Sequence, residues 1–561
     1  MAFDHRKYRP YAPIAKRDRR WPDQVISRTP DWCAVDLRDG NQALVKPMSV
    51  AQKKKLFQLL VDIGFKEIEV GFPAASQTDF DFVRALIEEN RIPDGVTVQV
   101  LTQAREDLIA RSFESLEGAK SAVMHVYNST STVQREQVFG LDRDGIKQIA
   151  IRGAEWVRQY AAQYPQTDWT FQYSPESFTG TEIDYAVEVI DAVNHVWQPQ
   201  AGQKVVINLP ATVEMSTPNV FADMVETVID TMQQRQHVRI SLHTHNDRGC
   251  AVAAAELGVM AGADRIEGTL LGNGERTGNM DLITMAMNLY SQGIDPQLDF
   301  SRMKEIVEVV QEVTDIRMHP RHPYAGEFVY AAFSGSHQDA IRKCLARYNE
   351  GDIWEVAYLP IDPADVGRRY EEVVRINSQS GKGGVVHVLE RDYGITLPRW
   401  LQVEFSKIVQ REAESDGGEI NGARIHQLFN QHYLSIRDGW KLQGYDLHRS
   451  GDVVEASLSV GGPGQPSRSL VAKGNGAVSA LVSALAAEQG IEIRVESFDE
   501  FSLGDNTASN ALACVRMQVD GQMVSAAALA DGRSIHQHLD VLASRKPAGQ
   551  VGTDDRRSAG E

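Results

Sequence analysis

Two histidines placed two positions apart are the residues of this chain best suited to metal chemistry. His243 and His245 follow the apolar segment 238–242, so on a β-strand both imidazoles leave from the same face. Two neutral imidazoles on one face, joined by a carboxylate such as Asp39, form a ligand set that suits a divalent metal. An isolated His-x-His pair is more often an ordinary surface feature, so the surrounding residues decide its interpretation.

Composition argues against two classes of partner. The 561 residues carry a net charge of −18 without a long basic run, which argues against nucleic acid. No apolar run reaches the length of a membrane span, and the polar N-terminus lacks the apolar core of a secretory signal. The four cysteines are far apart and form no CxxC pair, a pattern typical of a reducing compartment. We therefore expect a cytoplasmic protein that binds neither membrane nor nucleic acid.

Short apolar segments rich in β-branched residues alternate with helix-like segments, such as 50–64 and 78–91, through the first half of the chain. The apolar segments begin at residues 32, 67, 96, 121, 168, 203, 238 and 264. Eight strands alternating with helices over about 250 residues predict a (β/α)8 barrel. A doubly wound open sheet is the alternative, but no Gly-rich dinucleotide-binding turn follows the first strand.

Residues capable of chemistry stand at the C-terminal end of every predicted strand. In a (β/α)8 barrel these ends form the face on which the active site lies. The strand-end positions include Arg38, Asp39, Gly71, Leu101, His125, Ser174, Glu176, Asn208, Pro210, Thr212, His243, His245 and the loop 270–279. We therefore predict an active site at this end of the barrel.

The predicted barrel mouth brings together one carboxylate and two imidazoles. Asp39, His243 and His245 meet there, and Asn279 would add a carbonyl oxygen. Such a mixed set with open positions suits Mg, Mn, Co or Zn. It leaves room for the carboxylate and keto oxygens of a 2-oxo acid. Arg38 would stabilise negative charge that develops on that keto oxygen.

Six longer motifs carry a resemblance to a known family. They are DLRDGNQAL, GFPAASQTDFDFVR, YSPESFTGTE, NLPATVE, HTHNDRGCAVAAAELG and GNGERTGN. In these motifs the chain resembles the 2-isopropylmalate synthases, acyl-CoA Claisen-condensing barrel enzymes. The resemblance implies condensation of acetyl-CoA with 2-oxoisovalerate and thioester hydrolysis to 2-isopropylmalate and CoA, the committed step toward leucine. It also implies a divalent metal, Mg or Mn before Zn or Co, and a monovalent cation such as K.

The condensation requires a base that removes a methyl proton from the thioester. Glu176, Glu275 and His337 are candidates by residue type, and the sequence does not choose among them. By resemblance, six strand-end residues line the oxo-acid pocket, with Thr212 near the substrate carboxylate. The six are Leu101, His125, Ser174, Asn208, Pro210 and Thr212. None of them is Arg or Lys, so we expect an apolar substrate side chain and moderate selectivity.

Past residue 300 the alternation stops, and an amphipathic helix over 301–316 leads into a Pro-rich break. The segments that follow resemble the linker subdomains of the same family, in which a histidine and a tyrosine approach the partner subunit's barrel. His337 and Tyr370 are the matching positions, with Tyr358 as a rival for the tyrosine. We therefore expect a homodimer in which His337 acts in trans.

The last third contains an internal repeat of three strands and a helix. The helices fall at 477–490 and 533–546. The repeat resembles the leucine-sensing domain of the family, so leucine is expected as a feedback inhibitor. Gly474 and Gly476 stand before the first helix, whose N-terminus can hold a carboxylate. Residues 530–533 replace the Gly-rich turn expected in the second copy, which predicts weaker or differently tuned inhibition.

These observations together predict an α/β chain with six parts. They are an N-terminal extension (1–30), a catalytic (β/α)8 barrel (31–305), linker subdomain I (306–365), linker subdomain II (366–430), an α+β regulatory domain of two βββα units (431–548) and a disordered tail (549–561).

Two other functions are compatible with a metal-binding barrel. A hydrolase that uses a metal-bound hydroxide usually needs more ligands, including a metal-bridging group, and the sequence shows no such set. A sensor that has lost activity would have eroded strand ends, whereas Asp39, His243, His245 and Asn279 are all present.

Overall fold

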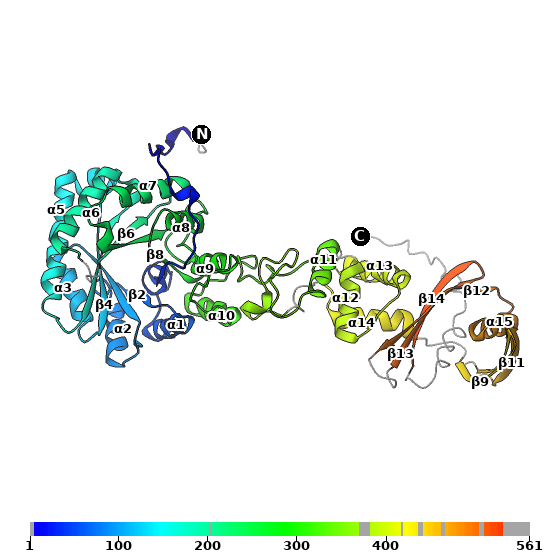
Figure 1. The fold of residues 1–561 in the computed structure, drawn as a ribbon. Helices are drawn as coiled ribbons and strands as arrows, with labels where there is room; N and C mark the ends of the chain where they lie inside the picture. Colours follow the sequence, from blue (N-terminus) through cyan, green and yellow to red (C-terminus); the bar gives the residue numbers. More distant parts are fainter. Residues whose placement is uncertain are drawn as a thin grey trace, which may run out of the picture. The chain divides into compact units, whose positions relative to one another are not determined.

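The chain divides into two units in the computed structural model (Figure 1). The first unit comprises residues 1–329 and 361–368, and the second comprises 330–360 and 369–561. Within them the structure describes residues 5–200, 205–369, 382–416, 419–435, 441–461, 466–503 and 510–530. Among these described residues, no helix is long and apolar enough to cross a membrane.

Eight parallel strands close into a barrel in the first unit, and the strand order follows the chain. The strands are β1 (Asp31–Ala34), β2 (Glu67–Gly71), β3 (Thr97–Gln103), β4 (Ser121–Ser129), β5 (Asp168–Glu176), β6 (Val205–Ala211), β7 (Val238–Thr244) and β8 (Arg265–Gly268). The barrel closes where β1 pairs with β8, and there Cys33 lies opposite Glu267. The predicted (β/α)8 barrel is confirmed, and the open sheet is excluded.

Helices connect the strands and surround the barrel (Figure 1). They are α1 (Val50–Ile63), α2 (Gln77–Glu88), α3 (Glu106–Ser115), α4 (Thr132–Gln134), α5 (Arg143–Ala161), α6 (Ile183–Trp197), α7 (Pro218–Thr231), α8 (Ala251–Met260) and α9 (Leu282–Tyr290), followed by α10 (Met303–Thr314). Local sequence sets the limits of α1. Ser49 and Gln52 form a capping box, and Gly64 ends the helix in the left-handed conformation with φ of 114°.

The chain departs from the sequence expectation directly after β1. Arg38 and Asp39 are predicted to stand at the end of the first strand, but β1 ends at Ala34, and Asp36–Gly40 (η3) form one turn of π-helix. Three amides of this turn donate to the carbonyl oxygen of Val35. Single π turns are rare and frequently mark functional sites. This one carries both Arg38 and Asp39.

The second unit begins with helices and continues with two antiparallel sheets. The helices are α11 (Gly335–Leu345), α12 (Lys382–Tyr393), α13 (Arg399–Asp416) and α14 (Gly422–Phe429). The sheets contain β9 (Lys441–Ser450), β10 (Val453–Gly461) and β11 (Arg468–Gly474), then β12 (Ile493–Leu503), β13 (Asn510–Val519) and β14 (Gln522–Ala530), with α15 (Ala477–Gln489) between them.

The predicted repeat is present as two three-stranded sheets. Leu481 and Leu485 of α15 pack with Leu458 in the core of the first sheet. On the second sheet, Leu512 shares a core with Phe405 of α13, so a linker helix covers that face. The helix predicted over 533–546, the turn before it and the tail lie outside the described residues.

A buried ion pair holds the π turn from the outer layer of the barrel. The Nζ of Lys53 lies 2.7 Å from a carboxylate oxygen of Asp79 and donates to the carbonyl oxygen of Leu37 at 2.8 Å. The other Asp79 oxygen accepts from the amide of Phe72 at 2.8 Å. Burial lowers the pKa of Lys53, and Asp79 opposes that effect. Helix α1, helix α2 and the turn are thereby connected.

We expect Asp79→Ala to destabilise the barrel by about 3–5 kcal/mol, because it leaves the Lys53 ammonium buried and uncompensated. The measurement is the denaturant midpoint of the barrel transition. Glu312→Ala is the matched control, because it removes a surface pair with Lys55 at 2.6 Å and should barely move the midpoint. An Asp79→Ala midpoint equal to the wild-type value would contradict a stabilising role for the pair.

Candidate active site

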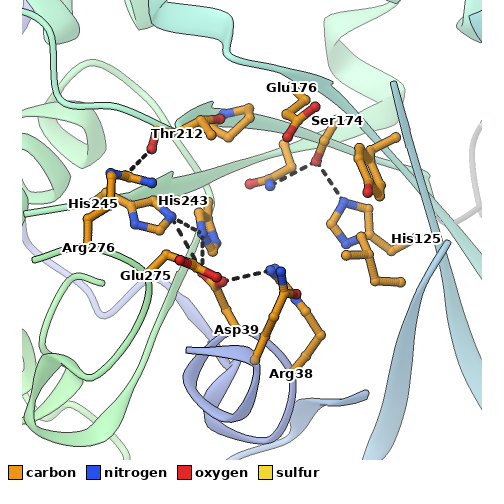
Figure 2. Close-up of a pocket in the computed structure, with 15 residues that line it drawn as sticks. Arg38, Asp39, His125, Ser174, Glu176, Thr212, His243, His245, Glu275 and Arg276 are labelled. Carbon is orange, nitrogen blue, oxygen red and sulfur yellow. Dashed lines mark hydrogen bonds and ion pairs between the residues drawn. The ribbon is translucent and has the colours of Figure 1, made fainter. Parts of the chain in front are cut away.

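A pocket of about 210 Å³ opens at the C-terminal ends of the barrel strands (Figure 2). Its lining residues are Arg38, Asp39, Gln42, Leu101, His125, Tyr127, Ser174, Glu176, Asn208, Pro210, Thr212, His243, His245, Glu275 and Arg276. Every strand-end residue to which the sequence analysis gave a catalytic, substrate-binding or metal-binding role lines this pocket, except Asn279. Residues separated by more than 200 positions in the chain therefore share one cavity.

Three potential metal ligands meet at one side of the pocket. A carboxylate oxygen of Asp39 lies 3.1 Å from Nε2 of His243 and 3.4 Å from Nε2 of His245. The two imidazole nitrogens are 3.1 Å apart. Ligand atoms about 3 Å apart can surround one ion at about 2.1 Å. All three residues are buried, so a bound ion would be shielded from bulk water.

Asn279 adjoins these ligands through a backbone bridge to His245. Its amide nitrogen donates to the carbonyl oxygen of Asn273 at 3.1 Å. Its Oδ1 is buried and has no hydrogen-bond partner among the described residues. A buried carbonyl oxygen without a partner is costly, and a nearby cation would remove that cost. The orphaned oxygen and the three donors together fit a divalent metal.

The surroundings shift the pKa values of His243 and His245 in opposite directions. Burial lowers the pKa of His243, but Asp39 and Glu267 override it and raise the value to about 9. Burial and the neighbouring His243 lower the pKa of His245 to about 3. Burial raises the pKa of Asp39, yet Arg38 and His243 hold it well below its usual range. Asp39 is therefore anionic. A metal ion would displace the proton that lies between Asp39 and His243.

Arg38 lies beside the metal ligands, with Nη1 3.2 Å from a carboxylate oxygen of Asp39. Its Nε donates to Glu69 on β2. Glu69 also accepts from Nδ1 of His125 at 2.8 Å. Burial raises the pKa of Glu69, but Arg38 and His125 reverse the shift and hold it at about 2. The guanidinium therefore sits between two carboxylates at the pocket floor.

A buried layer of charged residues, not predicted from the sequence, lies beneath the pocket. Glu69 and Glu267 are fully or almost fully buried, at 0% and 1% exposure. Arg265 donates to Glu267 at 2.6 Å and to Gln99 at 2.9 Å. The available signal was an acidic residue inside each of two apolar strands, EIEVG and RIEG.

The candidate bases fall into two groups. Glu176 and Glu275 both line the pocket, and Glu176 accepts a hydrogen bond from the Ser129 hydroxyl. His337 belongs to α11 in the second unit, where its ring stacks on Tyr358 with centroids 3.9 Å apart. Tyr370 lies outside the described residues.

Comparison with known proteins decides the family. Residues 29–310 match the HMGL-like family model, 327–390 match the alpha-isopropylmalate synthase post-catalytic domain-like model, and 419–535 match the LeuA allosteric (dimerisation) domain. The 2-isopropylmalate synthase of Alcanivorax borkumensis is 68% identical over 530 residues, covering 94% of this chain and 95% of that protein. The chain belongs to the 2-isopropylmalate synthase family. It is therefore an acyltransferase, as the six motifs predicted.

Other matches agree with this family assignment or are too remote to bear on it. The 2-isopropylmalate synthase of Rhodospirillum rubrum is 53% identical over 543 residues, covering 95% of each chain. A hydroxymethylglutaryl-CoA lyase of known structure from Pseudomonas aeruginosa is 19% identical, with a TM-score of 0.42 over 51% of this chain and 93% of that chain.

Removing either imidazole should strongly weaken metal binding at this site. We expect His243→Ala and His245→Ala to lower Mn²⁺ affinity by more than about 100-fold while the circular dichroism spectrum is unchanged. The measurement is titration calorimetry on chelator-treated enzyme. His195→Ala, on the outer surface of α6, is the control and should bind as the wild type does. Unaltered affinity in both barrel variants would rule out these ligands.

Proposed function

We propose that this enzyme condenses acetyl-CoA with 2-oxoisovalerate and hydrolyses the thioester, giving 2-isopropylmalate and CoA. The observation that carries the proposal is one pocket that combines a divalent-metal ligand set, the Arg38 guanidinium and two carboxylates. Relatives of that name match nearly the whole chain and support it. Mg²⁺ or Mn²⁺ suits the site best, because the carboxylate, the amide oxygen and an oxo acid would supply oxygen ligands.

The pocket favours an oxo acid with an apolar side chain. Leu101 and Pro210 form apolar wall, and the two cations of the pocket already have partners. Arg38 pairs with Asp39 and Glu69, while Arg276 pairs with Asp247 at 2.7 Å. Because Arg38 is also proposed to serve the keto oxygen, a second carboxylate on the substrate would meet no further cation among the residues that line this pocket. Each methylene of an apolar side chain changes discrimination by only about 1–3 kcal/mol.

A divalent ion held by Asp39, His243, His245 and Asn279 would supply Lewis-acid polarisation of the keto group. The Arg38 guanidinium would stabilise negative charge on the keto oxygen as the new bond forms. A carboxylate removes a proton from the methyl carbon of the thioester, and that carbon bonds to the keto carbon. The π electrons of the keto C=O bond move to its oxygen, which takes up one proton to become the hydroxyl group. Water then replaces CoA at the thioester carbonyl, and the thiol leaves with one proton.

A second cavity, of about 630 Å³, adjoins the first and shares Tyr127 and Glu176 with it. The aromatic residues Trp156 and Phe139 line this cavity, and Arg105 and Arg152 add cations. Aromatic faces stack on purines, and guanidinium groups pair with phosphates. We infer that acetyl-CoA occupies this cavity. Because Glu176 borders both cavities, its position favours Glu176 over Glu275 as the base.

We expect thiol release from acetyl-CoA to require an oxo acid and to be fastest with 2-oxoisovalerate. Pyruvate and 2-oxobutyrate should react about 10- to 200-fold more slowly per missing methylene, in kcat/KM. The assay follows free thiol across a panel of oxo acids. 2-Oxoglutarate, with its second carboxylate, is the control expected to be nearly inert. Equal thiol release without any oxo acid would indicate a simple thioester hydrolase instead.

We also propose a homodimer, supported by the match of residues 419–535 to the LeuA allosteric (dimerisation) domain. In this proposal His337 and a tyrosine complete the partner's site. Among the described residues, Tyr358 is the candidate for that tyrosine, because His337 stacks on it and it is 59% exposed.

The two glycines before α15 have different environments. A Cβ on Gly474 would lie 2.4 Å from the backbone nitrogen of Ala480, so glycine is needed there for strand and helix to pack. A Cβ on Gly476, the N-cap of α15, would meet nothing within 4 Å. The open space lies at a helix N-terminus, which attracts carboxylates. We propose that the carboxylate of leucine binds at Gly476.

Gly476→Val should leave catalysis intact and weaken leucine inhibition, because the side chain enters the space proposed for the ligand. A loss of about 5- to 150-fold in inhibition constant corresponds to typical allosteric coupling. The measurement is a leucine titration of the full-length enzyme. Gly444→Val is the matched control, because its Cβ on β9 also meets nothing within 4 Å. Identical curves for Gly476→Val and wild type would place the effector elsewhere.

A further inference from the structure

A closed ring of polar contacts surrounds the pocket floor. In order it runs through Arg38, Glu69, His125, Ser174, Asn208, Glu267, His243 and Asp39, and back to Arg38. Six of these residues line the pocket, and the other two, Glu69 and Glu267, do not. Those two carboxylates lie beneath the pocket and contact side chains that line it.

The Glu69 carboxylate organises the oxo-acid side of the ring. One of its oxygens accepts from Nε of Arg38, and the other accepts from Nδ1 of His125 at 2.8 Å. With the proton on Nδ1, Nε2 of His125 accepts from the Ser174 hydroxyl at 2.7 Å (Figure 2). The Ser174 oxygen in turn accepts from the amide of Asn208 at 3.0 Å. The Glu69 carboxylate thus fixes both the position of the Arg38 guanidinium and the tautomer of His125.

The Glu267 carboxylate organises the metal side. It accepts from Nδ1 of His243 at 2.9 Å, which leaves Nε2 for a metal ion. Its second oxygen accepts from Arg265 at 2.6 Å and from Gln172 at 2.7 Å. The Asn208 amide, 3.4 Å from Glu267, joins the two sides within the ring. Outside the ring, Gln99 donates to Glu69 and accepts from Arg265, which donates to Glu267, so these two residues also connect the sides.

Both carboxylates are expensive to bury. Replacing buried ionic groups with apolar residues of similar volume is often neutral or stabilising, so burial of charge is weak evidence for stability. Apolar side chains normally fill a (β/α)8 barrel interior. Charged residues at these inward positions therefore point to a role in the site above them.

We propose that Glu69 and Glu267 are positioning residues with separate duties. Glu69 orients Arg38 and His125 toward the oxo acid, and Glu267 orients His243 toward the divalent metal. The first duty rests on the proposed function for the identity of the substrate. The second duty depends only on metal binding.

Glu69→Gln and Glu267→Gln test these duties, and each variant is the matched control for the other. Titration calorimetry with Mn²⁺ on chelator-treated enzyme, and with 2-oxoisovalerate on Mn²⁺-loaded enzyme, gives the two affinities. Thiol release at saturating Mn²⁺ gives kcat. We expect Glu267→Gln to lose about 10- to 100-fold in Mn²⁺ affinity and to recover most of its kcat at saturating Mn²⁺. Glu69→Gln should keep its Mn²⁺ affinity but lose oxo-acid affinity and kcat.

Variants that retain the charge serve if either glutamine variant fails to fold. Glu69→Asp and Glu267→Asp keep the negative charge beside arginine but have a shorter side chain. They should show the same difference between metal affinity and oxo-acid affinity, with smaller losses. Equal losses of metal affinity and kcat in both members of a pair, or no loss in either, would overturn the proposal. If wild-type enzyme releases no thiol with any oxo acid, the proposed function fails, and the contrast in Mn²⁺ affinity alone still decides the inference.

Discussion

Compensation of charge inside the barrel is the constraint on which the rest of this structure depends. The carboxylate of Glu267 is buried at 1% exposure between Arg265 and His243, and each of these contacts makes its burial tolerable. Removing one partner from such a buried pair costs about 3–5 kcal/mol, because the remaining charge has no solvent. The strands that carry these residues must therefore keep one register, and the ligand positions at their ends follow from that register.

The barrel and most of its pocket could be predicted from sequence because parallel strands present their C-terminal ends at one face. His243, His245 and Ser174 needed only a correct strand assignment to be placed together. Glu69 and Glu267 could not be placed in the same way. Strands buried on both faces read as continuous apolar runs, so the pattern does not reveal which residues point inward.

The π turn could not be predicted for a different reason. Its form depends on one carbonyl oxygen, that of Val35, which accepts from three amides in succession, and no residue type specifies that arrangement. In the second unit, the repeat was visible because antiparallel strands alternate in polarity. The different environments of Gly474 and Gly476 were not visible, because they depend on the distance of each glycine from the next turn of helix.

The π turn is held from two sides, which ties the stability of the barrel to the geometry of the pocket. From the outer layer, Lys53 donates to the carbonyl oxygen of Leu37, and from the interior Glu69 accepts from Arg38. An apolar interior would cost less to fold, but it would leave Arg38 free to pair with Asp39 alone and compete for that carboxylate with a metal ion bound as proposed. Because the Arg38 guanidinium contacts both Glu69 and Asp39, the Asp39 oxygen nearest the histidines stays available to a metal ion. In the proposed site, the buried charge thus allows a divalent metal and Arg38 to act side by side.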